Sequence, residues 1–295
     1  MKIGIISPSA PSTHTEERAK QYKNGLKTLR SMGFECVVAP HAEENFGYIS
    51  SSRENRLSDL HQMFSDESVD VVLCANGGRN ASHLLDGLDF RLIEASKKML
   101  VGFSDISTLL NPIYAETGGR QIHGPMVTWG FDVNDSKTNE SFKFALEGKK
   151  QAFPLNEDTR FLKGNEIQGT LVGGNLASLL NLIGTPYVPD WKDKVLFWEE
   201  TNEALNSVDR MITHMKNAGI LAQLGGMIIG HLDEVKDSFS DVKKDVLKTI
   251  VELCAEYDFP ILKTNIFGHH ITPNYSIPIG GIIRINKFTS ELEIE

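Results

Sequence analysis

The chain has 295 residues, of which 40% are hydrophobic and 23% are charged, and its formal net charge is −9. These values are ordinary for a globular protein with one large domain or two of moderate size. The acidic balance disfavours binding to a nucleic-acid polymer. No run of eighteen apolar residues is present, so we expect no membrane span.

Apolar strands alternate with amphipathic helices over the first 130 residues. We expect strands at 2–7, 35–39, 69–74 and 99–103, and helices at 16–32, 53–64, 81–88, 91–96 and 107–116. Continuously apolar strands that alternate with helices are typical of a parallel sheet covered on both faces. The sequence therefore predicts an N-terminal α/β domain.

The pattern changes at about residue 134 and resumes at 168. Residues 134–166 are polar and charged, as in a surface helix plus linker. Further strands are expected at 168–171, 194–198, 226–230, 261–265 and 281–285, with a weaker one at 291–295, and helices within 173–184 and at 206–218 and 243–257. We expect an α/β fold with a parallel-sheet domain at 1–135, a linker at 136–165 and a smaller mixed-sheet α/β domain at 166–295. Ligands commonly bind in the cleft between two such domains, so the active site is expected there.

The cysteines and the N-terminus favour a cytoplasmic protein. Cys36, Cys74 and Cys254 are far apart, odd in number and set among apolar residues, which favours buried reduced thiols over disulfides or metal ligands. The apolar stretch Ile3–Ile6 is too short for a signal peptide and is soon followed by Pro8.

Ser104 stands where the strand at 99–103 gives way to a helix. A serine at this point can be an N-cap, whose hydroxyl accepts a backbone N–H of the first turn. It can also be the nucleophile of a tight strand-to-helix elbow. Ile106 occupies the place of the second glycine in the usual G-x-S-x-G motif. The stretch alone leaves both interpretations open.

A serine nucleophile needs a base, an acid and oxyanion donors. His269 and His270 lie in the loop FGHHITPN, and adjacent histidines do not match zinc-ligand spacing, so no metal and no cofactor are expected. Glu199 and Glu200 end the strand at 194–198. Successive strand side chains point to opposite faces, so at most one of the two can reach a histidine, and the alternation does not say which.

The loop ANGGRN at 75–80 follows the strand at 69–74. Its glycines allow backbone amides to approach a ligand closely. A phosphate-binding loop is the competing interpretation, but the chain has neither G-x-G-x-x-G nor a Walker lysine here. An oxyanion-hole loop is at least as good an interpretation.

Taken together, these motifs resemble the serine LD-carboxypeptidases, the muramoyltetrapeptide carboxypeptidase family, which also contains the microcin C self-immunity peptidases. The resemblance covers nearly the whole chain and depends on the order of SPSAP, the GG loop, GFSD at 102–105, HGPM, GGNL, LFWEE and GHxxxPN…PIG at 268–280. It implies a triad of Ser104, Glu199 and His269. It also implies oxyanion donors at the backbone N–H groups of Asp105 and Gly78. Further substrate contacts are expected from Gly77, Arg79 and His123.

The resemblance implies a serine peptidase that hydrolyses the amide bond before the terminal D-alanine of murein tetrapeptides, in cytoplasmic cell-wall recycling. One alternative is a self-immunity peptidase that cleaves peptidyl or aminoacyl nucleotides, with Trp129, Trp191 or Trp198 available to stack on the base. A second alternative is a non-catalytic two-lobed protein that binds a small ligand. The expected partner is thus a small peptide or a peptidyl nucleotide, and a homodimer is a further expectation. The GG loop departs from the Arg-Gly-Gly-Tyr-Gly of many members.

Overall fold

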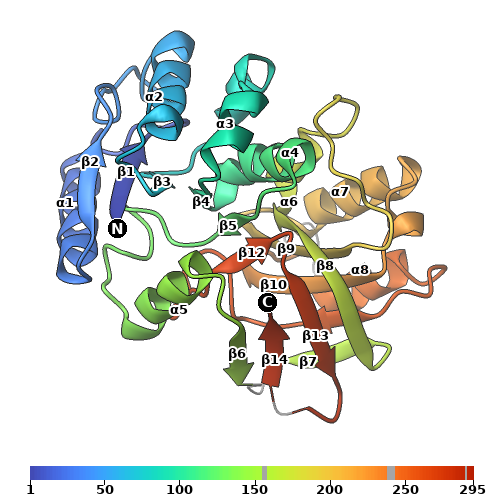
Figure 1. The fold of residues 1–295 in the computed structure, drawn as a ribbon. Coiled ribbons are helices and arrows are strands. Elements are labelled where there is room, and N and C mark those ends of the chain that lie inside the picture. The colour runs from blue at the N-terminus through green and yellow to red at the C-terminus, as the bar shows by residue number, and fades with distance from the viewer. Residues whose placement is uncertain (155–157, 238–242, 290) are drawn as a thin grey trace.

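Two β-sheets and the helices that cover them make up the fold (Figure 1). The structure, a computed structural model, describes residues 1–154, 158–237, 243–289 and 291–295. Strands β3 (Val71–Cys74) and β4 (Leu100–Gly102) are wholly apolar and buried, and so is β1 (Lys2–Ile6) apart from Lys2, as a sheet with helices on both faces requires. The α/β fold with one mainly parallel and one mixed sheet confirms the prediction from sequence.

The first sheet has six strands in the order β12-β5-β4-β3-β1-β2. Its first five strands along the chain are parallel to one another. They are β1 (Lys2–Ile6), β2 (Glu35–Val38), β3 (Val71–Cys74), β4 (Leu100–Gly102) and β5 (Gln121–His123). The helices of this part are α1 (Glu16–Ser31), α2 (Arg53–Ser65), α3 (Phe90–Ser96) and α4 (Ser107–Thr117), with short 3₁₀ helices at Ala81–Gly87 and Ser104–Ile106.

The second sheet has eight strands in the order β6-β14-β13-β8-β9-β10-β11-β7. Its centre, β8 to β11, is parallel, and the outer strands are antiparallel to their neighbours. The strands are β6 (Gln151–Pro154), β7 (Arg160–Lys163), β8 (Glu166–Asn175), β9 (Val195–Thr201), β10 (Gly226–Asp233), β11 (Ile261–Lys263), β13 (Ile282–Asn286) and β14 (Glu291–Ile294). The accompanying helices are α5 (Ser136–Leu146), α6 (Leu176–Leu180), α7 (Leu205–Asn217) and α8 (Val246–Leu253), with a 3₁₀ turn at Leu221–Gln223.

One strand from the C-terminal part of the chain belongs to the first sheet. Strand β12 (Ile277–Ile279) pairs antiparallel with β5, and Ile277 lies opposite His123. In Figure 1 this red strand lies beside the green β5, although the two are far apart in sequence. The loop that contains His269 directly precedes β12, so this pairing brings that loop to the first sheet.

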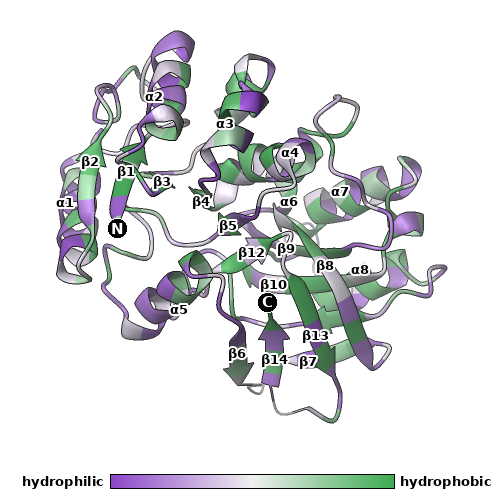
Figure 2. Ribbon diagram, viewed as in Figure 1, coloured by the Kyte–Doolittle hydropathy of each residue, from purple (hydrophilic) through white to green (hydrophobic). Residues whose placement is uncertain are grey.

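A continuous apolar core joins the two sheets. Buried residues from α4, such as Leu109, pack in the same cluster as Leu176 of α6 and Phe197 of β9. A second cluster, which includes Ile3, Leu73 and Phe142, fills the opposite face of the first sheet beneath α1 and α5. Figure 2 shows the corresponding pattern, with hydrophobic colour concentrated on the strands and hydrophilic colour on the outer helix faces.

Several elements differ from their predicted bounds. Strand β8 spans Glu166–Asn175, well beyond the expected 168–171, and the expected helix at 81–88 is a 3₁₀ helix. The segment 136–165, expected as a linker, contains α5, β6 and β7, and the last two extend the second sheet at its two edges. The strands β5 and β12 were not expected, because β5 is short and has polar residues on both sides of Ile122, and β12 is short and contains Pro278.

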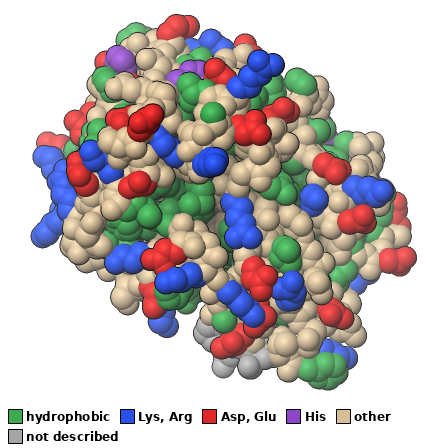
Figure 3. Space-filling model, viewed as in Figure 1, with side chains coloured by type: hydrophobic (Ala, Val, Ile, Leu, Met, Phe, Trp, Pro, Cys, Tyr) green, Lys and Arg blue, Asp and Glu red, His purple; other side chains and the backbone are tan. Residues whose placement is uncertain are grey.

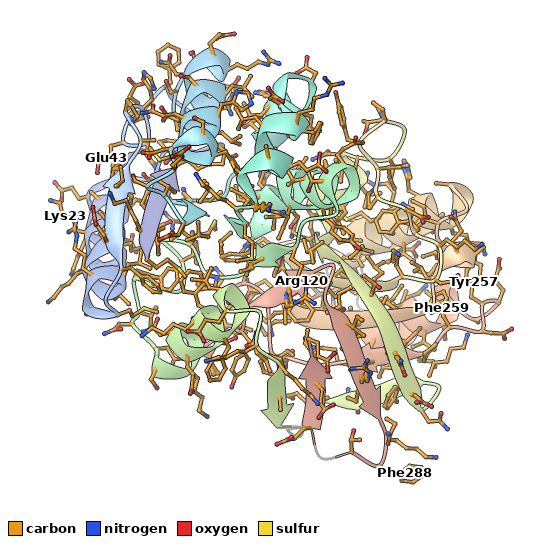
Figure 4. All side chains as sticks on the ribbon, in the orientation of Figure 1. Lys23, Glu43, Arg120, Tyr257, Phe259 and Phe288 are labelled. Carbon is orange, nitrogen blue, oxygen red and sulfur yellow. The ribbon has the colours of Figure 1, made fainter. Side chains whose placement is uncertain are left out.

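The surface of the described residues is mixed in charge. Acidic and basic side chains are interspersed over the face shown in Figure 3. Phe288 projects from the turn between β13 and β14, as Figure 4 shows, and is 87% exposed. The three cysteines are free thiols. None of the helices in the described ranges is both long enough and apolar enough to cross a membrane.

Candidate active site

A cavity of about 530 Å³ lies at the carboxyl ends of the first sheet's parallel strands. Ligands of open α/β sheets commonly bind at this edge. Loops after β1, β3, β4 and β5 contribute one side, and loops after β9 and β11 contribute the other. Of the residues predicted from sequence, the cavity is lined by Ser104, His269, Gly77, Gly78 and Arg79.

Ser104 occupies a strained turn at the end of β4. Its φ angle is +61°, a left-handed conformation that costs an L-residue about 1–2 kcal/mol. It opens the 3₁₀ turn Ser104–Ile106, which leads directly into α4. This is the strand–turn–helix geometry that presents a serine hydroxyl above a sheet. No side-chain cap hydrogen bond is formed at the start of either helical segment, so the turn has the form of an elbow and not of an N-cap.

The side chain of Asp105 fixes this turn against two neighbouring loops. It is 2% exposed, and its Oδ2 accepts hydrogen bonds from Ser9 Oγ at 2.5 Å and from the Ala81 N–H at 2.8 Å. Ser9 Oγ in turn accepts from the Asn80 N–H at 3.2 Å. Sequence reasoning assigned a role only to the Asp105 backbone, and the only signal for its side chain was the SPSAP motif that contains Ser9.

The GG loop lies directly against Ser104. A Cβ atom placed on Gly77 would be 3.2 Å from Ser104 Cβ. Gly78 has φ of +151°, and a Cβ there would be 2.7 Å from the Ala10 nitrogen, so only glycine fits. The Ala10 N–H donates to the Gly77 carbonyl at 2.9 Å. The loop therefore approaches the serine closely because it has no side chains at these positions.

Arg56 stabilises the loops that follow β1 and β3. Its side chain is 2% exposed, and its Nη1 donates to the carbonyl oxygens of Pro8 at 2.8 Å and Asn80 at 3.3 Å. A buried guanidinium satisfied by backbone carbonyls holds the two loop ends together. This role could not be predicted from the sequence, because an arginine in a helix is most often exposed to solvent.

His269 and Glu199 form a buried pair beside the cavity. His269 Nδ1 lies 2.6 Å from Glu199 Oε2, and the His269 backbone N–H donates to the same oxygen at 3.3 Å. Glu199 is fully buried and His269 is 7% exposed. The contact places the Nδ1 proton toward the carboxylate, which leaves Nε2 as the ring's acceptor. Ser104 Oγ forms no hydrogen bond among the described residues, and hydrogen bonds between a nucleophile and its base often tighten only when substrate binds.

The pKa values of Glu199 and His269 shift in opposite directions. Burial raises the pKa of Glu199, but the charge and hydrogen bond of His269 outweigh it, and the net shift is downward. Burial lowers the pKa of His269, but the charge and hydrogen bond of Glu199 outweigh it, and the net shift is upward. Each group therefore favours the charged form of the other.

Glu200 points to the other side of β9. Its Oε2 accepts from the Ala177 N–H at 2.8 Å, at the start of α6, and its Oε1 accepts from Asn175 Nδ2 at 2.8 Å and from the Thr201 N–H at 3.0 Å. Burial, together with the nearby charge of Glu199, raises the pKa of Glu200 to about 7. Of the two glutamates, only Glu199 contacts His269.

His123 lies behind the site and does not line the cavity. Its ring is fully buried among Phe103, Phe197 and Phe267, and neither ring nitrogen has a hydrogen-bond partner among the described residues. Burial lowers its pKa to about 4, so the ring is neutral at neutral pH. The expectation that His123 contacts substrate is corrected here: the ring is fully buried and does not line the cavity, whereas Phe103, which packs edge-on against it, does.

The remaining candidates divide into buried and cavity-lining residues. Trp191 and Trp198 are 4% and 0% exposed, whereas Trp129 lines the cavity. His270 also lines it, with its ring edge-on to Trp129 at 4.9 Å between centroids. In the described part of the chain, no three His, Cys, Asp or Glu side chains are grouped so as to hold a metal ion.

Comparison with known proteins gives matches over most of the chain. The LD-carboxypeptidase N-terminal domain matches residues 3–124, and the LD-carboxypeptidase C-terminal domain matches residues 168–285. A probable murein peptide carboxypeptidase of Bacillus subtilis is 29% identical over 99% of this chain and 91% of its own length. A putative carboxypeptidase of Streptomyces coelicolor is 31% identical over 78% of this chain and 74% of its own length.

Solved structures share the fold. An MccF-like protein from Bacillus anthracis has a TM-score of 0.88 and 29% identity, covering 99% of this chain and 96% of its own. The microcin C7 self-immunity protein MccF, solved in complex with aspartyl sulfamoyl adenosine, has a TM-score of 0.89 and 23% identity, covering 99% and 95%. At that identity the second likeness shows the fold alone.

Proposed function

Because this chain belongs to the LD-carboxypeptidase family, we propose that it is a serine peptidase that releases the terminal D-alanine of murein tetrapeptides. The setting we propose is cytoplasmic cell-wall recycling. The relative from Bacillus subtilis is named a probable murein peptide carboxypeptidase, which supports this substrate class. The observation that carries the proposal is the buried His269–Glu199 contact of 2.6 Å beside a cavity that Ser104 also lines.

In the proposed reaction Ser104 Oγ attacks the scissile carbonyl while His269 Nε2 accepts its proton. Glu199 holds the imidazole through Nδ1 and stabilises the positive charge that forms. The imidazolium then protonates the leaving amine, D-alanine departs, and an acyl-serine remains. Water, deprotonated by the same nitrogen, releases the peptide and regenerates the serine hydroxyl.

The oxyanion of each tetrahedral intermediate needs donors in place before the reaction. We assign this role to the backbone N–H groups of Asp105 and Gly78. The assignment is supported by the hydrogen bonds of the Asp105 side chain to Ser9 and Ala81, which hold the elbow and the GG loop together. Preorganised donors of this kind typically contribute about 3–4 kcal/mol each to transition-state stabilisation.

Replacing the nucleophile tests the proposal most directly. We expect Ser104→Ala to lower turnover by on the order of a millionfold, because the loss of a triad nucleophile removes the covalent route. D-Alanine release from a purified tetrapeptide measures this, and circular dichroism checks that the variant is folded. Labelling by a fluorophosphonate should disappear in the same variant. A variant that retains more than a few per cent of the wild-type rate contradicts the nucleophile assignment.

A second function is favoured by one observation, the position of Trp129. It is the only tryptophan among the residues that line the cavity in the described structure, so it is the side chain available to stack on a nucleobase. MccF was solved with aspartyl sulfamoyl adenosine. We therefore assay that compound beside the tetrapeptide: hydrolysis of the nucleotide analogue without D-alanine release would favour the self-immunity activity. Absence of both reactions and of fluorophosphonate labelling would favour the non-catalytic binding protein.

A further inference from the structure

Arg18 of α1 is a restrained cation at the wall of the catalytic cavity. Its guanidinium carbon lies 4.6 Å from the centroid of the Trp129 ring, and Nη1 donates to Gln21 Oε1 at 3.1 Å. The side chain lines the same cavity as Ser104 and His269. Within the described residues it forms no ion pair with a carboxylate. Most of its five N–H donors therefore remain available to a ligand.

The catalytic cavity has a lining that favours anions. Its ionisable residues are two arginines and three histidines, and no aspartate or glutamate lines it (Arg18, Arg79, His14, His269 and His270). This is unusual in a chain whose formal net charge is −9. A cleft lined by one sign of charge concentrates ligands of the opposite sign.

A second cavity that also includes Arg18 has acidic residues in its lining. An adjoining cavity of about 500 Å³ shares Arg18, Phe103, Trp129 and His270 with the first, but it is also lined by three acids, Glu17, Asp132 and Asp135. The T-shaped pair of Trp129 and His270 stands between the two. The acids repel a carboxylate from the second cavity, so a ligand carboxylate is directed to the Ser104 side.

We propose that Arg18 binds the free C-terminal carboxylate of the substrate and so makes this enzyme a carboxypeptidase in preference to an amidase. The inference rests on the proposed function, since it concerns the substrate of that same site. The planar guanidinium, already restrained by the ring of Trp129 and by Gln21, suits two parallel hydrogen bonds to one carboxylate. A restrained arginine loses less conformational freedom on binding than an exposed one. Arg79, which is exposed and forms no hydrogen bond or ion pair among the described residues, lacks this restraint.

The experiment compares two substrates, a tetrapeptide with a free terminal carboxylate and the same peptide with a terminal amide. We expect the wild type to prefer the acid by about ten- to a hundredfold in kcat/KM, as a charge-assisted pair contributes about 1.5–3 kcal/mol. Arg18→Gln should remove the preference by slowing only the acid. Arg18→Lys should restore part of it, because it keeps the charge but not the planar fork. Lys20→Gln, an exposed change on the same helix, should leave the ratio unaltered.

Binding to the Ser104→Ala variant separates this inference from the proposed function. Calorimetry with the acid and the amide should show the same acid preference, lost when Arg18→Gln is added. If the wild type hydrolyses neither peptide but this Arg18-dependent binding persists, the proposed function is wrong but the role of Arg18 in binding the carboxylate stands. A preference that survives Arg18→Gln, one that disappears in Arg79→Gln instead, or no acid preference at all overturns the inference.

Discussion

The two faces of β9 at its carboxyl end carry the same residue type in opposite electrostatic states. On one face, Glu199 contacts His269 and its pKa is lowered. On the other, Glu200 accepts two N–H groups at the start of α6 and that of Thr201, yet burial and the charge of Glu199 raise its pKa to about 7. A cationic partner, and not the number of hydrogen bonds, decides which carboxylate stays ionised at neutral pH. Adjacent identical side chains can thus hold different charge states in one strand.

The largest effect is expected from Glu199→Gln, which tests the difference between the two glutamates. The amide keeps the shape of the side chain but removes the charge that stabilises imidazolium, so we expect turnover to fall by about two to four powers of ten. Stopped assays of D-alanine release give kcat for this variant and for Glu200→Gln on one substrate. Glu200→Gln should stay within several-fold of the wild type. The reverse pattern would transfer the role of triad acid to Glu200.

The pH dependence of kcat/KM sharpens the same comparison. The proposed base, His269, must be neutral to accept a proton, and Glu199 raises its pKa above its usual 6.5 despite burial. We expect activity to rise with pH through a midpoint above 6.5 in the wild type. In Glu199→Gln the attraction is lost while burial remains, so the midpoint should move downward. Rate profiles between pH 5 and 9 measure both midpoints, and identical midpoints would contradict the assigned coupling.

The smallest effect is expected from Glu200→Gln, and it concerns stability. The folded-state pKa of Glu200, about 7, lies above the ordinary 4.5. The stabilisation that follows from this raised pKa is therefore fully present below pH 4.5 and is lost as pH rises through 7. At about 1.4 kcal/mol per unit the loss amounts to roughly 3 kcal/mol. Urea unfolding at pH 5 and pH 8 should show that the free energy of unfolding falls more between these two pH values in the wild type than in the variant. Equal drops would mean that Glu200 does not titrate in this range.

Much of the fold followed from apolar patterning. The buried strands β1, β3, β4 and β9 are short continuous apolar runs, and each was expected close to its observed position. The edge strands β6 and β7 were not, because Gln151, Arg160 and Lys163 interrupt any such run. Their strand structure comes from pairing with β14 and β11, which only the assembled sheet provides.

The candidate site was only partly predictable. Sequence motifs and family resemblance predicted Ser104, Glu199 and His269 as the triad. The triad itself remains a proposal. The alternation of a strand could not tell Glu199 from Glu200, because it does not say which face meets the first sheet. The carboxylate of Asp105 and the guanidinium of Arg56 act on loops distant in sequence, and their hydrogen bonds exist only once those loops meet. The prediction that His123 contacts substrate was wrong, because the HGPM motif does not show that three aromatic rings from other segments pack around it.

The pairing of β12 with β5 sets an order of events during synthesis on the ribosome. The N-terminal part of a chain emerges and folds first, but here the first sheet lacks its last strand until Ile277–Ile279 emerge, long after its other five strands. Until then β5 is an open edge that can pair with other chains. The loop that contains His269 arrives just ahead of β12 and is brought to the elbow by the same pairing. The nascent chain therefore contains Ser104 long before His269, and the proposed triad can assemble only after the loop that contains His269 has been made.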